Sequence, residues 1–231
     1  VPMCNVEVES FFDTRIMILN IKNNLAFRTN QIIKRLFDII LSLFGIIFFS
    51  PLLIFVALYV KLDSPGPIVY KRWVVGRNKR KFGFYKFRSM CVNSDEILRS
   101  LLEKDKEARK EYEEYYKLKN DPRITKAGHF IRRTSLDELP QLFNVLMGQM
   151  SLVGPRPITE NEVPRYEKYI DEYYMVRPGI TGLWQVSGRS DVDYKERVTM
   201  DVWYVHNWSV WLDFVLLFRT VKIVLCGKGA Y

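Results

Sequence analysis

A long uncharged apolar segment constrains the fold of this chain more than any other feature. Residues 39–60 are 22 in number and carry no charge, and a helix of that length can span a lipid bilayer. Basic residues flank both ends, with Lys34 and Arg35 before the segment and Lys61 after it. Because positive charge favours the cytoplasmic side of a membrane, a simple span would break this rule at one end.

Ser50 and Pro51 lie near the middle of this segment. Proline removes a backbone donor and kinks a helix, and a neighbouring serine can satisfy the carbonyl that is freed. Two interpretations stay open on this pattern. The helix either bends at Ser50 and Pro51 and returns to the same face of the membrane, or it spans the membrane with a proline kink.

The chain is expected to have three parts. Residues 1–30 combine a strand-rich piece with a polar connector, and the chain opens on Val1 without a signal-peptide pattern. We interpret them as a linker from an upstream region of a longer protein. Residues 31–62 form the membrane helix, and residues 63–231 form the remaining domain.

The remaining residues predict an α+β fold that is mostly helical. Periodicity and turn residues place the elements in this order: strands of a small hairpin at 68–70 and 82–87, helices at 94–119 and 159–174, and a Gly-rich loop with a short strand at 177–189. Ser135 and Glu138 have the spacing of a capping box, which predicts a helix that starts at Ser135.

The last apolar stretch, residues 203–225, is interrupted by charged residues. It therefore fits an amphipathic helix that lies at the membrane interface, with Trp203, Trp208 and Trp211 at headgroup depth. A helix packed in the core explains the same pattern equally well.

The net charge of +9 indicates nucleic acid, anionic lipid or a phosphate-bearing ligand as partner. The sequence has no signature of a nucleic-acid-binding fold, and much of its positive charge lies beside the apolar segment. We therefore expect no nucleic acid as partner and favour anionic lipid. The three cysteines and two histidines are scattered, so any metal should be a hard cation held by carboxylates and phosphates.

The adjacent carboxylates of Asp137 and Glu138 are the first candidates for chemistry. Such a pair raises a proton affinity or binds a divalent cation. Near a helix N-terminus, the dipole would also favour an ionised, nucleophilic carboxylate. An isolated pair of this kind more often occupies the first turn of a helix without any catalytic role.

Basic residues occupy conformationally special places around this pair, beside prolines, glycines and strand ends. Arginine suits bidentate recognition of phosphate, and lysine neutralises charge at a point. Together with two carboxylates they suggest phosphoryl transfer with Mg²⁺, although any single arginine could be a weak surface ion pair. The basic candidates are Lys86, Arg88, Arg132, Arg133, Arg156, Arg177 and Arg189.

Seven spaced motifs together resemble one known family. They are KRLFD (34–38), YKFRSM (85–90), DPRIT (121–125), IRRTSLDELPQL (131–142), SLVGPRP (151–157), RPGITGLWQVSGR (177–189) and DVWYVHNWS (201–209). From residue 34 to the C-terminus the chain resembles the bacterial sugar transferases, also called monotopic phosphoglycosyl transferases or polyprenyl-phosphate hexose-1-phosphate transferases.

The resemblance implies a re-entrant helix broken at Ser50 and Pro51, and a catalytic domain in residues 63–231. It implies that Asp137 is the nucleophile and that Glu138 helps to hold Mg²⁺. Asp137 would attack the sugar phosphate of a UDP-sugar, releasing UMP, and a polyprenyl phosphate, most naturally undecaprenyl phosphate, would take up the sugar-1-phosphate.

The resemblance also implies further binding residues and a place in the cell. Basic positions near the phosphates would be Lys86, Arg88, Arg132 and Arg156, the loop around the nucleotide or sugar would supply Arg177 and Arg189, and Asp201 is a further acidic position without an assigned role. Extended members of the family carry an upstream domain, which could hold two copies together as a homodimer. They commonly transfer galactose or glucose phosphate. The catalytic domain would lie on the cytoplasmic face of the bacterial inner membrane, in the first membrane step of a surface glycan such as O-antigen or exopolysaccharide.

Two other readings remain for comparison. The chain could be a non-catalytic membrane scaffold of a polysaccharide assembly system, although such a scaffold needs neither Asp137 nor Glu138. It could also be a lipid phosphatase that uses Asp137, which would release inorganic phosphate rather than UMP.

Overall fold

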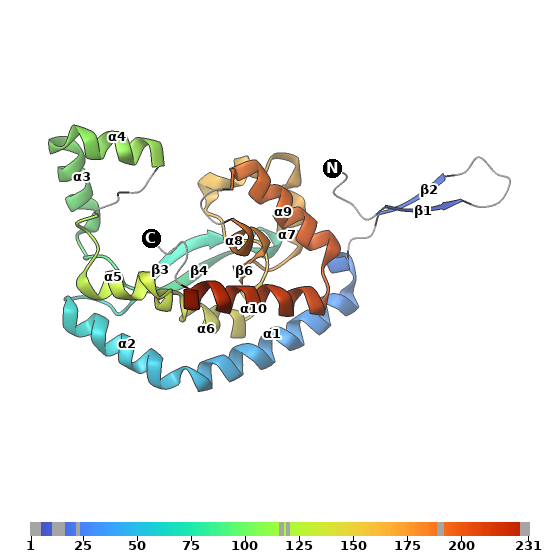
Figure 1. Ribbon diagram of the computed structural model, residues 1–231, viewed down its shortest axis with the longest axis horizontal. Helices are drawn as coiled ribbons and strands as arrows, with labels where there is room; N and C mark the ends of the chain where they lie inside the picture. Colours follow the sequence, from blue (N-terminus) through green and yellow to red (C-terminus); the bar gives the residue numbers. More distant parts are fainter. Residues whose placement is uncertain are drawn as a thin grey trace. The chain divides into compact units, whose positions relative to one another are not determined.

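The computed structural model describes residues 6–10, 17–21, 24–115, 118, 121–188 and 192–226. Within these residues the chain is mostly helical, with three two-stranded sheets, which confirms the predicted α+β class (Figure 1). The chain divides into two compact units, each described by itself below. The first unit comprises Val1–Phe48, Lys71–Phe84 and Gln141–Gly229, and the second comprises Phe49–Tyr70, Tyr85–Pro140 and Ala230–Tyr231.

The N-terminal strands form a hairpin of their own. Strand β1 (Val6–Ser10) pairs antiparallel with β2 (Met17–Ile21), and Val8 lies opposite Leu19 in this register. The expectation of a strand-rich N-terminal piece is confirmed for these residues. Their interpretation as a linker stays a prediction.

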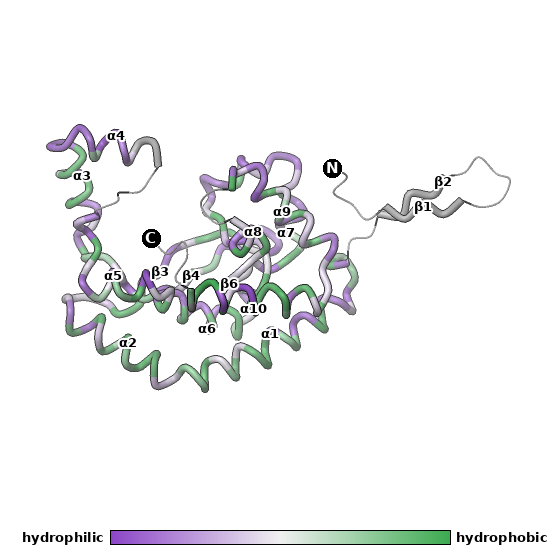
Figure 2. Tube along the Cα trace, in the orientation of Figure 1, coloured by the Kyte–Doolittle hydropathy of each residue, from purple (hydrophilic) through white to green (hydrophobic). Residues whose placement is uncertain are grey.

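The apolar segment forms two helices. Helix α1 (Arg28–Phe48) ends before Phe49, and α2 (Ser50–Asp63) begins with Pro51 in its first turn. Proline is favoured there because its missing N–H would have no partner inside the helix. Figure 2 colours most of both helices as hydrophobic. The predicted break at Ser50 and Pro51 is therefore confirmed.

Among the described residues, no single helix is long and apolar enough to cross a membrane. Taken together, α1 and α2 meet the requirements of length and composition, and the pair is bent by 62° at its break.

In the first unit a short parallel sheet joins two of the predicted motifs. Strand β5 (Ser151–Val153) pairs with β6 (Gly179–Thr181). A Cβ atom on Gly179 would collide with the backbone nitrogen of Gly154, so glycine is required for this close approach. Around the sheet lie α6 (Gln141–Leu146), η4 (Glu160–Tyr169), α7 (Ile170–Met175), α8 (Leu183–Ser187), α9 (Tyr194–Asn207) and α10 (Val210–Cys226).

A buried carboxylate ties the ends of the first unit together. Asp213 in α10 is paired with Lys34 in α1 at 2.6 Å. Tyr204 donates to Asp213 Oδ1 at 2.7 Å, and the indole of Trp208 donates to Oδ2 at 3.1 Å. Three donors therefore satisfy one buried charge, as burial of a carboxylate requires.

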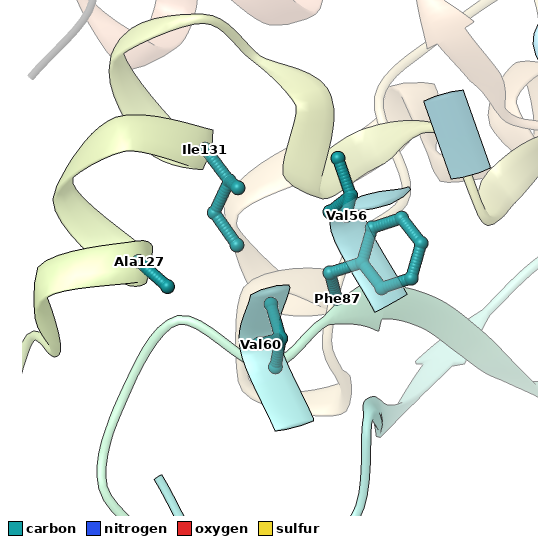
Figure 3. Packing of buried hydrophobic residues seen from close by; sticks show 5 residues of the cluster. All are labelled: Val56, Val60, Phe87, Ala127 and Ile131. Carbon is teal, nitrogen blue, oxygen red and sulfur yellow. The ribbon is translucent and has the colours of Figure 1, made fainter. Parts of the chain in front are cut away.

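The second unit has its own apolar core. Val56 and Val60 of α2 meet Phe87, Ala127 and Ile131 there (Figure 3). Phe87 ends the predicted hairpin, whose strands β3 (Val69–Val75) and β4 (Lys81–Phe87) pair across the turn η2 (Arg77–Lys79). Most of the hairpin, Lys71–Phe84, is counted with the first unit. The remaining elements of this unit are α3 (Ser94–Lys104), α4 (Lys106–Tyr115), α5 (Lys126–Arg133) and η3 (Leu136–Glu138).

Three predicted helical stretches are interrupted in the structure. The one expected at 159–174 forms the 3-10 helix η4, which contains Pro164 and a non-helical Glu167, and then α7. The helix expected at 94–119 divides at Asp105, whose Oδ1 accepts from the backbone N–H groups of Glu107 and Ala108. An aspartate with free local N–H groups caps a new helix instead of continuing the old one. The stretch expected at 203–225 divides between α9 and α10.

Two sequence expectations about single residues are wrong. Trp208 is buried, because its indole N–H binds Asp213, so it does not lie at a surface as Trp203 and Trp211 do. The capping box at Ser135 is absent, since Ser135 has a left-handed backbone (φ 57°) and makes no side-chain cap. A capping box occurs instead at Thr159 and Glu162.

The Gly-rich loop at 177–189 contains the predicted strand β6. It also contains the short helix α8, which the three glycines had hidden from the sequence pattern.

Candidate active site

Strand β4 supplies the lysine of the candidate site. Successive side chains of a strand point to opposite faces, so burial of Phe87 in the apolar core directs Lys86 to the other face. Lys86 is 28% exposed, which leaves its ammonium group near the surface.

Helix α5 is held close to the end of this strand. Thr125 caps the helix by accepting from the backbone N–H of Gly128 at 3.0 Å. A Cβ atom on Gly128 would collide with the backbone carbonyl of Ser89, so the helix can approach the strand only with glycine there. Arg132, one turn later, donates from Nε to Ser89 Oγ at 2.8 Å.

A strained turn follows α5 and carries the two carboxylates. Ser135 adopts φ 57° and ψ 18°, a left-handed conformation that few residues other than glycine adopt. The short helix η3 then places Asp137 in a buried position and Glu138 in a half-buried one. Backbone strain of this kind persists where the surroundings enforce it, often at functional sites.

The carboxylates of Asp137 and Glu138 share one cation. Lys86 Nζ lies 2.6 Å from Glu138 Oε1 and 3.5 Å from Asp137 Oδ2. Burial raises the pKa of the Asp137 carboxyl, the Lys86 ammonium opposes this rise, and the neighbouring charge of Glu138 adds to it. Arg132 also lowers the pKa of Asp137 through its charge.

A second ion pair, between Arg123 and Asp121, acts on Arg132 through its charges. Arg123 donates two hydrogen bonds to the Asp121 carboxylate, from Nε at 2.8 Å and from a terminal guanidinium nitrogen at 2.7 Å. Although burial works in the other direction, hydrogen bonds from Arg123 hold the pKa of Asp121 below its ordinary value. Burial lowers the pKa of Arg132, while the charges of Asp137 and Asp121 oppose that shift.

Arg88 has a different environment. Its guanidinium is buried and donates to the backbone carbonyls of Ser64 at 2.6 Å and Pro65 at 2.9 Å. These carbonyls follow the C-terminus of α2, where a cation is favourable. Arg88 therefore caps the C-terminus of α2, and its contact with substrate phosphate stays a prediction.

Three other predicted residues, Arg156, Arg177 and Asp201, belong to the first unit. The guanidinium of the exposed Arg156 lies 5.8 Å from the ring centre of Trp184. Arg177 donates from Nε to the carbonyl of Gly148 at 2.8 Å. Arg189 lies outside the described residues.

Asp201 is a buried carboxyl with a perturbed pKa. Tyr166 donates to its Oδ2 at 2.8 Å, and its Oδ1 has no partner among the described residues. Burial raises the pKa of Asp201 to about 7, against the opposing effects of the Tyr166 hydrogen bond and the Arg156 charge.

The structure brings together the carboxylates and the lysine that the sequence predicted as site residues, but sequence reasoning missed the residues that contact them. Asp137, Glu138, Lys86 and Arg132 were all predicted and lie in one unit. Ser89 and the pair of Asp121 and Arg123 were not assigned a role. The spacing of an aspartate and an arginine around a proline could have indicated the ion pair, whereas nothing in the sequence indicates the partner of Ser89.

Comparison with known proteins gives one family. A family model described as bacterial sugar transferase matches residues 29–227. An uncharacterized sugar transferase of Haemophilus influenzae is 54% identical over 230 residues, which cover 100% of this chain and 49% of the relative. An undecaprenyl-phosphate galactose phosphotransferase of Salmonella typhimurium is also 54% identical, with 100% and 48% covered.

A more distant relative has a different sugar in its name. The UDP-glucose:undecaprenyl-phosphate glucose-1-phosphate transferase of Klebsiella pneumoniae is 41% identical over 212 residues, covering 87% of this chain and 42% of the relative. The chain therefore spans about half the length of these relatives.

Proposed function

Because the chain belongs to the bacterial sugar transferase family, we propose that it transfers a sugar-1-phosphate from a UDP-sugar to undecaprenyl phosphate and releases UMP. The observation that carries the proposal is the buried Asp137 beside Glu138, with the Lys86 ammonium group paired with both carboxylates. The names of the relatives support a polyprenyl acceptor and favour galactose or glucose as the sugar.

The proposed chemistry has two displacements at one phosphorus atom. An oxygen of Asp137 attacks the phosphorus that bears the sugar, the pyrophosphate P–O bond breaks, and UMP leaves with the bonding electrons. An oxygen of undecaprenyl phosphate then attacks the same phosphorus, breaks the bond to Asp137 and restores the carboxylate. A carboxylate nucleophile suits such a double displacement.

The surroundings of Asp137 support its role as nucleophile. Burial raises its pKa and so makes its oxygen more basic, and the Lys86 charge opposes that effect. A buried carboxylate is also poorly hydrated, so less water must be removed before it attacks. Lys86 and Arg132 would face the negative charge of the phosphate during transfer.

Mg²⁺ fits the donor set of this site. Magnesium is commonly held by one or two carboxylates together with substrate phosphates, and Asp137 and Glu138 supply two carboxylates. The described residues contain no group of three or more metal-binding side chains, so phosphates would complete its shell. When bound, Mg²⁺ would neutralise charge on the phosphates.

The other candidate residues complete the proposal. The nucleotide, sugar or phosphates would be contacted by Arg88, Arg156, Arg177 and Arg189. Asp201 would orient Arg156, whose charge acts on it. The pair of helices α1 and α2 would form the re-entrant anchor, with the catalytic residues on the cytoplasmic face of the inner membrane. A homodimer would be held by the upstream region.

The test is UMP release from a panel of UDP-sugars, with detergent-solubilised protein, Mg²⁺ and undecaprenyl phosphate. Asp137→Asn should abolish release, and Asp171→Asn, an exposed aspartate in α7, should leave it unchanged. Glu138→Gln should raise the Mg²⁺ concentration needed for half-maximal rate.

Each alternative has its own result in the same assay. Release of inorganic phosphate in place of UMP would identify a phosphatase. A folded protein that releases UMP from no sugar would favour the scaffold. Full activity in Asp137→Asn would show that the proposed nucleophile is wrong.

A further inference from the structure

An open pocket of about 230 Å³ lies in the first unit, beside the N-terminal turns of α1. Its lining includes four arginines and two apolar side chains of α1: Arg28, Arg35, Arg77, Arg177, Ile32 and Leu36. No carboxylate lines it among the residues that the structure describes. The residues differ entirely from the carboxylates and lysine of the candidate active site.

The arginines of the pocket are held by neutral groups. Arg35 donates to the backbone carbonyls of Val145 at 2.6 Å and Leu146 at 2.9 Å. Arg77 donates to the side-chain oxygen of Gln31 at 2.6 Å. These acceptors fix the directions of the guanidinium groups but carry no negative charge that would neutralise them.

The charges of the pocket act on one another. Burial lowers the pKa of Arg177, and the positive charges of Arg77 and Arg35 lower it further. The Nε atom of Arg77 is buried and has no partner in the described part of the chain. Like charges so placed are unfavourable without an anion, so the pocket is suited to a negatively charged ligand.

Asp38 acts on Arg177 through its negative charge, but its carboxylate is bound elsewhere. The carboxylate of Asp38 accepts from Ser151 Oγ at 2.9 Å and from the backbone N–H of Leu152 at 3.0 Å. It therefore points into the β5 strand and is absent from the lining of the pocket.

The apolar part of the lining continues onto an exposed face of α1. Arg28, Ile32, Arg35 and Leu36 recur at spacings of three and four residues, so they share one helix face. Ile32 is 53% exposed and Leu36 is 56% exposed. Further along the same face lie the exposed side chains of Ile40, Leu43 and Ile47. A ligand in the pocket would therefore touch charge at one end and hydrocarbon at the other.

We propose that this pocket binds the phosphate group of an anionic lipid, with the arginines around the phosphate and the lipid chain along Ile32 and Leu36. Guanidinium groups match phosphate oxygens through paired hydrogen bonds. Binding at this pocket needs no turnover at Asp137, so it can be measured apart from the proposed reaction, although Arg177 is also a candidate substrate-binding residue.

The test measures binding by calorimetry in detergent solution, using the protein at its native length. Three probes separate the sources of affinity: dioctanoyl phosphatidic acid, dioctanoylglycerol without a phosphate, and inorganic phosphate without a chain. Phosphatidic acid should bind more tightly than either of the other probes.

Two variants remove one charge each from the pocket, Arg28→Gln and Arg77→Gln. Each should weaken the binding of phosphatidic acid by about tenfold, since a hydrogen bond to a charged group contributes roughly that factor. Arg80→Gln is the matched control, because Arg80 is an exposed arginine of the same hairpin and does not line the pocket. Its affinity should stay within about twofold of the unchanged protein.

Arg28 has an exposed side chain, so Arg28→Gln tests the pocket without disturbing the core. Equal weakening in all three variants would overturn the proposal in favour of general charge attraction. If inorganic phosphate binds as tightly as phosphatidic acid, the assignment of a lipid ligand is wrong. Equal binding of dioctanoylglycerol would overturn the role of the phosphate.

Discussion

At Asp137, burial and the charge of Lys86 act on the pKa in opposite directions. The balance determines at which pH the carboxylate is ionised. Burial alone favours the protonated acid, which cannot be a nucleophile. Under the proposed mechanism, Lys86 would therefore keep Asp137 ionised, in addition to any contact with phosphate.

Lys86→Met tests this role. Without the ammonium group the pKa of Asp137 should rise further, because the charge that opposes the effect of burial is lost. The acid limb of the pH profile of UMP release should move to higher pH with it. Lys104→Met, which removes an exposed lysine of α3, should leave the profile in place. If the rate of UMP release falls but the acid limb of the pH profile does not move, Lys86 contributes to substrate binding and not to the ionisation of Asp137.

The carboxyl of Asp201 makes stability depend on pH. Burial raises its pKa from 3.8 to about 7, so the folded protein holds this proton more tightly than the unfolded chain. The contribution to the free energy of unfolding is therefore complete below about pH 4 and is lost as the pH rises to about 7.

Asp201→Asn should remove this dependence, because the amide cannot ionise and can still accept from Tyr166. The loss of stability between pH 4 and 7 should shrink by an amount on the order of a few kcal/mol. Denaturant unfolding at a series of pH values measures it, with Asp171→Asn as the control. An unchanged slope would mean that Asp201 is ionised throughout this range.

The sequence predicted the residues of the candidate site better than their partners. Asp137, Glu138 and Lys86 could be selected because their motifs match a family pattern that few other sequences share. The environment that tunes them could not be found, since it depends on contacts such as Arg132 with Ser89, 43 positions apart in the chain. The backbone of Ser135 was also hidden, because its left-handed conformation is imposed by the surrounding fold.

At the scale of elements, the end of α2 depends on Arg88. The guanidinium donates to carbonyls of Ser64, Pro65 and Val60, the last at 3.3 Å. The last carbonyls of a helix lack partners inside the helix. One buried side chain directly after β4 therefore satisfies the carbonyls at the end of the second half of the apolar segment.

Arg88→Met should destabilise the protein by about 2–4 kcal/mol, because several buried carbonyls lose their donor. Thermal unfolding of the solubilised protein checks this, with Arg99→Met, on the exposed side of α3, as the control. The same variant tests the predicted phosphate contact. Loss of UMP release without a change in unfolding temperature would favour that contact over the capping role.

Element boundaries were predictable where they rest on local chemistry. The break at Pro51 and the hairpin around residues 76–81 follow from proline and turn residues, whose backbone preferences act within a few positions. The break at Asp105 also has a local cause, but an aspartate within a charged helix is common and gives no clear signal. The separation of α9 from α10 also has a local cause, because Ser209 Oγ accepts from the backbone N–H of Leu212 at 3.1 Å, but a single serine beside an apolar run gives little signal in the sequence.

At the scale of the whole molecule, charged residues in apolar helices have two different meanings. Asp213 interrupts the apolar pattern of residues 203–225 and suggests a surface helix. The structure instead buries it, with a side chain 1% exposed, against Lys34, whose side chain is 8% exposed. The two residues are 179 positions apart, so neither pattern alone could reveal that each charge neutralises the other.

Lys34→Met should therefore cost roughly 3–5 kcal/mol, since removing one partner leaves a buried charge uncompensated. Lys81 gives a matched comparison, because it pairs with Glu160 at 2.7 Å but both side chains are more than half exposed. Lys81→Met should cost less than about 1 kcal/mol. Equilibrium unfolding in denaturant compares the two losses. If they are equal, the pair of Lys34 and Asp213 is hydrated in solution, and α1 and α10 are not joined by a buried charge.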